Sequence, residues 1–154
     1  MLSPATPADL DDLATFLRAA DLTVAALAEP AVHLWLERDV AGAVRTTTGF
    51  ELGDDGEHAL VRSVAVRPDL RGDGDGLRLA RFALDRAVEA GARQAWLFSR
   101  RSGGFWQKLG FERTTTSAVA TALPDAHQVL LFRSTGQLDR EVAWQRPLRA
   151  SSAA

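Results

Sequence analysis

The sequence predicts an α/β domain with a mixed β-sheet, and three observations lead to this prediction. The length of 154 residues suits one domain with a hydrophobic core of its own. Alternating and β-branched segments dominate the first half of the chain, whereas the second half alternates between apolar strands and amphipathic helices. Early strands followed by a strand–helix–strand succession are typical of a mixed sheet.

The first half of the chain is expected to contain two helices and then three strands. Thr6 can cap a helix and Pro7 suits its first turn, after which apolar residues repeat at helical spacing as far as Ala20. A second, short helix is expected to end before Pro30, because the residue before a proline disfavours helical backbone. The expected elements are helices over residues 6–20 and 23–28 and strands over residues 32–37, 43–52 and 59–66.

The second half is expected to alternate between strands and helices. Residues 77–90 show the strongest helical pattern, with an apolar and a charged face, and Gly91 follows as a stop signal. The segment before Leu131 is predicted as a helix or a loop. The other expected elements are a strand over residues 92–99, a short helix over 104–109 and strands over 111–116 and 141–145. Residues 1–148 are expected to form a single domain, followed by a disordered tail of small and polar residues, 149–154.

The composition narrows the classes of function and location. The net charge is −2, whereas a nucleic-acid-binding protein usually has a basic excess. No apolar run has the length of a membrane span, and the segment from Met1 to Thr6 lacks the features of a signal peptide. The absence of cysteine excludes disulfides, thiolate metal ligands and a cysteine nucleophile. We therefore expect a cytoplasmic protein that binds neither nucleic acid nor a membrane, and we predict no metal site.

A glycine-rich loop joins the strand over residues 59–66 to the following helix. Glycines at positions 72, 74 and 76 allow positive φ angles and close approach of a ligand to the backbone. The first turn of the helix offers free N–H groups and the positive end of the helix dipole, which together suit a pyrophosphate. A Walker A loop is excluded because no Gly-Lys-Ser/Thr follows, and the glycine spacing does not fit a dinucleotide fingerprint. The alternative is a tight strand-to-helix turn without a ligand.

Two motifs resemble those of GNAT acetyltransferases. Arg71-x-x-Gly74-x-Gly76, after a Val-x-Val strand and a proline, resembles the coenzyme A pyrophosphate loop of this superfamily. The segment Gly104–Phe111, with aromatic residues before a final Gly-Phe, resembles its later signature. Residues 60–66 and 104–106 are most similar to the branch of arsenic-resistance N-acetyltransferases and to short amino-acid (glutamate) N-acetyltransferases. The resemblance implies the GNAT fold, a mixed and twisted sheet flanked by helices.

The resemblance also implies an activity. Acetyl-CoA would donate an acetyl group to the primary amine of a small, amino-acid-like molecule, and no metal would take part. The backbone of the strand end would pair with the pantetheine arm as an added β-strand does, and the loop would hold the pyrophosphate. Dimers are common among the relatives, so a homodimer is expected. The implied coenzyme-binding residues are Val64, Ala65, Val66, Arg71, Gly72, Asp73, Gly74, Asp75, Gly76 and Leu77.

The loop departs from the family pattern at Asp73 and Asp75. Two carboxylates would repel a pyrophosphate unless they point to solvent, so coenzyme affinity is expected to be weak. Arg100 and Arg101 follow the next strand and could offset this charge, or they could be solvated surface arginines.

Arg62 is the most suggestive side chain for substrate binding. By strand alternation, Leu60, Arg62, Val64 and Val66 should share one face, and a charge on an apolar face is costly unless it is paired. Arg62 would then bind a substrate carboxylate, which suits the geometry of a guanidinium. The alternative is a structural ion pair, with Glu51 or another carboxylate of the strands.

The chemistry of acetyl transfer favours a general base. Glu51 is the first candidate, because Gly49-Phe50-Glu51 resembles a Gly-Leu-Glu element of the branch, and Glu57 and His58 are the others. Many relatives carry a tyrosine four residues before the glycine of the late signature to protonate the departing thiolate. Position 106 is tryptophan and the chain has no tyrosine, so this acid is excluded. Water, the amine or the hydroxyl of Ser99 must supply the proton.

Two aromatic residues and two rival functions complete the sequence-based interpretation. Phe105 and Trp106 are expected to contact the coenzyme or to line the substrate pocket, a role compatible with core packing. The rivals to an enzyme are an acyl-CoA-binding module without catalysis and a partner-binding domain that uses the same scaffold without coenzyme.

Overall fold

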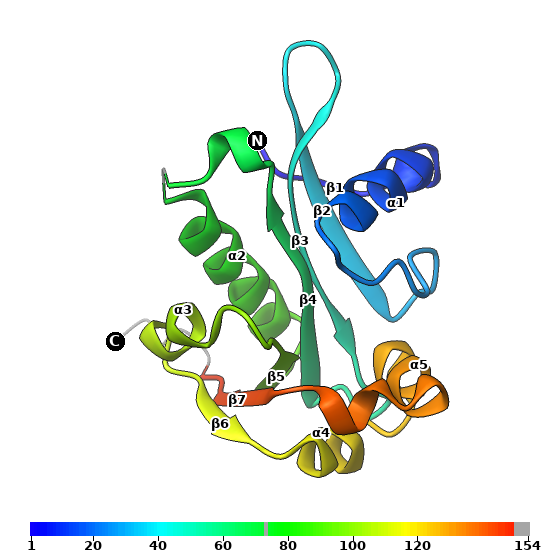
Figure 1. Ribbon diagram of the computed structural model, residues 1–154, viewed down its shortest axis with the longest axis vertical. Coiled ribbons are helices and arrows are strands. Elements are labelled where there is room, and N and C mark those ends of the chain that lie inside the picture. Colours follow the sequence, from blue (N-terminus) through cyan, green and yellow to red (C-terminus); the bar gives the residue numbers. More distant parts are fainter. Residues whose placement is uncertain (73, 150–154) are drawn as a thin grey trace. The chain divides into compact units, whose positions relative to one another are not determined.

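The computed structural model describes residues 1–72 and 74–149, and Figure 1 follows them from blue to red. Residues 150–154 of the predicted tail, and the predicted role of Asp73, therefore lie outside the described residues. The strands are β1 (Ser3–Pro4), β2 (Val32–Arg38), β3 (Val44–Leu52), β4 (His58–Val66), β5 (Gln94–Phe98), β6 (Glu112–Thr114) and β7 (Ala143–Pro147). The α-helices are α1 (Leu10–Ala19), α2 (Asp75–Glu89), α3 (Gly103–Lys108), α4 (Thr116–Ala122) and α5 (His127–Thr135). Short 3-10 helices cover η1 (Pro7–Asp9), η2 (Pro68–Leu70) and η3 (Gln137–Arg140).

The strands form one mixed sheet in the order β1-β2-β3-β4-β5-β7-β6. β4 and β5 run parallel, with Ala59 opposite Ala95, whereas the pairs β1–β2, β2–β3, β5–β7 and β6–β7 are antiparallel. A parallel pair needs a crossover between its strands, and α2 supplies it. The predicted α/β class with a mixed sheet flanked by helices is confirmed.

The chain divides into two compact units. The first unit contains Met1–Glu51 and Val61–Asp85, and the second contains Leu52–Leu60 and the chain from Arg86 onward. The single domain over residues 1–148 stays a prediction. In the first unit, Leu13 of α1 packs against apolar side chains of β2 and β3, namely Val32, Leu34, Leu36 and Val44.

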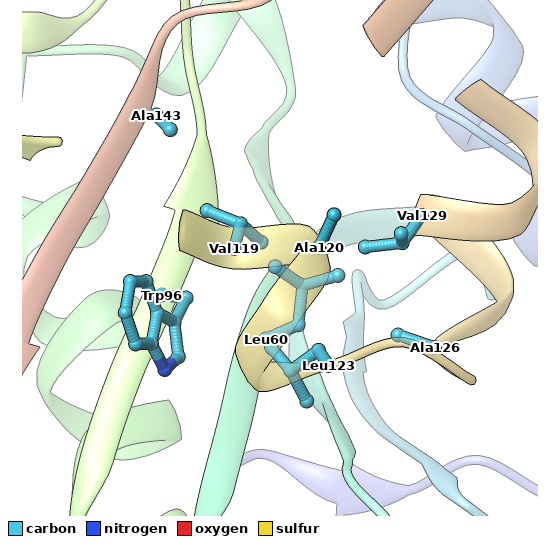
Figure 2. Packing of buried hydrophobic residues seen from close by; sticks show 8 residues of the cluster. All are labelled: Leu60, Trp96, Val119, Ala120, Leu123, Ala126, Val129 and Ala143. Carbon is cyan, nitrogen blue, oxygen red and sulfur yellow. The ribbon is translucent and has the colours of Figure 1, made fainter. Parts of the chain in front are cut away.

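The core of the second unit gathers side chains from strands and from the two helices near its C-terminal end. Figure 2 shows Val119, Ala120 and Leu123 beside Leu60 of β4 and Trp96 of β5. Ala126, Val129 and Ala143 extend the same cluster. This packing explains why the segment before Leu131 forms helices α4 and α5, where the sequence left helix or loop open.

Two expectations about secondary structure were wrong or incomplete. Residues 25–28 form turns and not the predicted helix over 23–28. Ala26 has a φ of 59°, which is left-handed, and the Thr23 hydroxyl accepts a hydrogen bond from the Ala25 N–H at 3.1 Å, so local bonding replaces the helix. The short strand β1 was not predicted, because its two residues carry no periodic pattern.

Among the helices of residues 1–72 and 74–149, none is both long and apolar enough to cross a bilayer.

Candidate coenzyme and acceptor site

The strand that precedes the glycine-rich loop is interrupted at Ser63. This residue has a φ of 61° in the middle of β4, a conformation that residues other than glycine seldom adopt. A left-handed residue breaks the pleat as a β-bulge does, and bulges often lie beside active sites. Alternation therefore does not carry across Ser63, and it no longer assigns Arg62 and Val64 to the same face.

Three successive threonines of β3 hold the elements around this interruption. Thr46, Thr47 and Thr48 are fully buried, and each hydroxyl donates one hydrogen bond. Thr46 donates to the Glu37 carboxylate at 2.7 Å, Thr47 to the Ser63 carbonyl at 2.7 Å and Thr48 to the Leu79 carbonyl at 2.8 Å. β3 is thereby tied to β2, to the distorted residue of β4 and to α2. The sequence indicated only that this β-branched segment is a strand.

The loop after β4 is fixed at its start by an arginine. The Arg67 guanidinium contacts the carboxylates of Asp39 at 2.8 Å and Asp69 at 2.7 Å, and its backbone N–H bonds to the Arg45 carbonyl at 2.9 Å. Hydrogen bonds from Arg67 lower the pKa of Asp39 and of Asp69. The loop thus leaves β4 along a defined path through η2.

The glycines of the loop provide backbone conformations that other residues avoid. Gly72 has a φ of 99° and Gly74 a φ of 81°. A Cβ atom at either position would meet nothing within 4 Å, so the left-handed backbone, and not crowding, explains these glycines. Arg71 is exposed at the start of this segment, and its Nε lies 3.3 Å from the Val66 carbonyl oxygen.

The beginning of α2 has the properties of an anion site. The Arg78 N–H bonds to the Gly74 carbonyl at 3.2 Å and closes the first turn. The N–H groups of Asp75, Gly76 and Leu77 precede this bond, so they lack an acceptor within the helix. A helix of fifteen residues adds the positive end of its dipole at this point. The free N–H groups and the helix dipole together favour an anion at this end of α2.

Glu51 and Arg62 meet inside the first unit. The Arg62 Nη1 lies 3.8 Å from the Glu51 Oε2, and the two side chains are 0% and 1% exposed. The Arg62 Nε donates to the Ser63 hydroxyl at 3.2 Å, while Nη1 and Nη2 have no hydrogen-bond partner among the described residues. Burial lowers the pKa of Arg62, and the charge of Glu51 acts in the opposite direction. This arrangement favours the ion-pair alternative over direct substrate binding.

Ser99, the candidate proton donor, belongs to the second unit. Its Oγ lies 2.6 Å from the Ser102 Oγ and accepts the Ser102 N–H at 3.1 Å, so it caps the turn before α3. The Trp144 Nε1 donates to the Ser99 carbonyl at 2.9 Å. These contacts fix the position of Ser99 within its own unit.

Phe105 and Trp106 lie on α3 in the second unit. Their ring centroids are 5.0 Å apart at an interplanar angle of 80°, and Trp106 contacts Phe111 edge to face at 5.4 Å. Trp106 is buried, whereas Phe105 is half-buried. Trp106 therefore packs in the core of its unit, and Phe105 is the more accessible of the two residues. Core packing was predicted to be compatible with a role in the site.

The other candidate bases and cations are engaged elsewhere or exposed. The His58 Nδ1 accepts the Trp96 N–H at 3.0 Å, and its Nε2 lies 3.8 Å from an Asp55 oxygen. Glu57 is exposed. Arg100 lies 3.5 Å from Glu141, which supports the surface-arginine alternative for that residue. Within the described part of the chain, no group of three His, Cys, Asp or Glu side chains could hold a metal ion.

A family model and solved structures were compared with the chain. Residues 3–111 match the model of the acetyltransferase (GNAT) family. A search of the curated proteins found no match.

Several solved structures share the fold. N-acetylglutamate synthase from Neisseria gonorrhoeae, in complex with coenzyme A and N-acetyl-glutamate, has a TM-score of 0.71 and 17% identity, covering 97% of this chain and 36% of that one. Rv2747 from Mycobacterium tuberculosis, in complex with CoA, has a TM-score of 0.74 and 15% identity, covering 97% and 99%. A GNAT-family acetyltransferase from Staphylococcus aureus Mu50 has a TM-score of 0.72 and 11% identity, with the same coverage. The chain thus spans about a third of the synthase, and at these identities the likeness shows the fold alone.

Proposed function

Because the chain belongs to the acetyltransferase (GNAT) family, we propose that it transfers an acetyl group from acetyl-CoA to the primary amine of a small, amino-acid-like molecule. The observation that carries this proposal is the start of α2. There a loop with two left-handed glycines leads into free N–H groups at the positive end of a long helix. The N-acetylglutamate synthase and Rv2747 structures, which share the fold, contain coenzyme A, and this supports the choice of ligand.

The coenzyme would lie along the end of β4 and the start of α2. Val64, Ala65 and Val66 follow the distorted Ser63, and their backbone groups would pair with the pantetheine arm. The loop and first turn, from Arg71 to Leu77, would hold the pyrophosphate through backbone N–H groups. Acetyl-CoA supplies a thioester whose carbonyl carbon forms a bond to the amine nitrogen as the C–S bond breaks, the amine losing a proton and the thiolate gaining one.

The acceptor side of the proposal rests on resemblance. An amino-acid-like acceptor, of the arsenic-resistance or the glutamate type, follows from the resemblance of residues 60–66 and 104–106 and is supported by the N-acetyl-glutamate bound to the Neisseria synthase. Glu51 as base and Ser99 as proton donor remain predictions, as do Arg62, Phe105 and Trp106 as acceptor-binding residues. The burial of Glu51 against Arg62 favours a structural role for both residues. A cytoplasmic location and a homodimer stay predictions as well.

The first experiment is a thermal melt of the protein with and without acetyl-CoA. Coenzyme at 100 times its dissociation constant stabilises by roughly 2.7 kcal/mol, which corresponds to about 5–10 °C for a chain of this size. No shift at millimolar acetyl-CoA would refute the proposed function.

Turnover is then measured with a panel of amino acids and other primary amines, by following released coenzyme A with a thiol reagent. The chain has no cysteine, so the protein contributes no thiol signal of its own.

A second candidate function is coenzyme binding without catalysis. It is favoured by the absence of any tyrosine in the chain and by Trp106 at the position where many relatives place one. Indole N–H groups donate hydrogen bonds but are too weakly acidic to protonate a thiolate. A coenzyme-dependent melt without turnover of any amine would support this function, and turnover of one amine would exclude it.

A further inference from the structure

Asp75 places a negative charge where the proposed function requires an anion site. It is the first residue of α2, beside the N–H groups that would hold a pyrophosphate, and its side chain is 20% exposed. An acidic residue suits the helix dipole, but it competes with a bound anion for the same positive potential. Left uncompensated, it would weaken coenzyme binding.

Arg78 contacts this carboxylate from one turn further along the helix. Its Nη2 lies 2.9 Å and its Nε 3.2 Å from the Asp75 Oδ1. Hydrogen bonds to Glu37 and to Asp75 raise the pKa of Arg78, so its charge persists at any pH at which the protein folds.

A buried carboxylate holds Arg78 in this position. The same Nη2 lies 2.7 Å from the Oε1 of Glu37, a residue of β2 that is 8% exposed. The hydroxyl of Thr46 on β3 donates to that oxygen as well, at 2.7 Å. An exposed i,i+3 ion pair contributes little by itself, because both side chains must be ordered for it to form. Here Glu37, which belongs to β2 and is hydrogen-bonded to Thr46 of β3, also holds the guanidinium. Arg78 therefore has little freedom to leave Asp75.

From this geometry we infer that Arg78 is a positioning residue, anchored by Glu37, which neutralises Asp75 and so preserves the anion site at the start of α2. The inference rests on the proposed function and adds the device by which a loop with an acidic first helical residue still accepts a pyrophosphate. This role does not require Arg78 to contact the acetyl group.

The test is a double-variant cycle read out as the dissociation constant for acetyl-CoA by calorimetry. R78Q is expected to bind acetyl-CoA about tenfold more weakly than the wild type, in the range of helix-terminal charge effects. D75N/R78Q is expected to recover most of that loss, because the uncompensated carboxylate is gone. KM for acetyl-CoA should follow the dissociation constant, while kcat changes less than twofold.

The matched control is R81Q. It removes one positive charge from the same helix, at a residue that is exposed to solvent. R81Q is expected to bind acetyl-CoA within about twofold of the wild type, because its charge is not held beside Asp75. If R78Q does not fold, R78K keeps the cation without the two-carboxylate bridge, and its affinity is expected to lie between those of R78Q and the wild type.

Three outcomes would overturn the inference. R78Q could bind acetyl-CoA as tightly as the wild type does, or R78K could do so if R78Q does not fold. The double variant D75N/R78Q could remain as weak as R78Q, which would make the role of Arg78 structural and not electrostatic. A loss in R81Q equal to that in R78Q would show a general charge effect. Failure of the wild type itself to bind acetyl-CoA would refute the proposed function together with this inference, and so differs from all three.

Discussion

Replacing Thr47 by valine tests whether the distorted residue of β4 is held in place by β3. Valine matches threonine in shape, so the change removes one hydroxyl without opening a cavity. The hydroxyl donates to the Ser63 carbonyl at 2.7 Å, and Thr47 is fully buried. A buried carbonyl that loses its donor costs about 1–3 kcal/mol. We therefore expect T47V to lower the free energy of unfolding by that amount.

The assay is equilibrium unfolding in urea, with the melting temperature as a second readout. For a chain of this size, about 1–3 kcal/mol corresponds to a decrease of roughly 2–12 °C. T15V is the matched control, because the exposed Thr15 hydroxyl bonds to the Asp11 carbonyl of its own helix, at 3.1 Å. T15V is expected to change stability by no more than about 0.5 kcal/mol. Equal stability changes in the two variants would refute the argument that Thr47 supports Ser63.

Three further predictions concern charge and backbone conformation. Burial raises the pKa of Glu37, but hydrogen bonds from Arg78, from Thr46 and from the N-terminal amine of Met1 outweigh it and lower the pKa from 4.5 to about 2. Roughly 3 kcal/mol of stability is therefore present above pH 4.5 and lost as the pH falls toward 2. Urea unfolding of the wild type and of E37Q should show this loss only in the wild type; parallel pH profiles would contradict it. G74A forces a side chain into a φ of 81° and should cost about 1 kcal/mol and weaken acetyl-CoA binding, measured by melting and calorimetry, whereas unchanged values would show that the loop does not need this conformation. R62M removes the guanidinium that faces Glu51 inside the protein and should lower stability by about 3–5 kcal/mol in urea unfolding; a stable variant with only a raised KM for the acceptor would instead support substrate binding by Arg62.

The fold was largely predictable because its elements carry periodic patterns. The alternating strands and the amphipathic helix over residues 77–90 appear in the structure within a few residues of their predicted bounds, and Gly91, with a φ of 101°, follows α2 as predicted. The helix predicted over residues 23–28 is absent for a local reason, because Ala26 adopts a left-handed backbone conformation. An alanine side chain gives no indication of such a conformation. Periodicity cannot detect a single backbone reversal.

The candidate site was predictable only where backbone chemistry defines it. Glycines before a helix indicate an anion site whatever surrounds them, so the loop was found from the sequence. The pair of Glu51 and Arg62 was one of two alternatives, because a sequence shows which residues could meet but not which do. Arg78 was missed, although its spacing from Asp75 is a recognised helical ion-pair spacing. Its other partner, Glu37, lies 41 residues away, and no local pattern reveals it.

The hydroxyls of β3 connect these observations. Thr47 holds the carbonyl of Ser63, where β4 leaves its regular course just before the residues proposed to contact pantetheine. Thr46 holds Glu37, which holds Arg78 against Asp75 at the proposed pyrophosphate site. Thr48 holds the backbone of α2 at Leu79. Hydrogen bonds between buried groups fix direction more sharply than apolar packing does, since a displaced donor leaves its partner unsatisfied. A strand with three successive buried threonines therefore determines the relative position of the two elements that the coenzyme would contact, although none of the three needs to touch it.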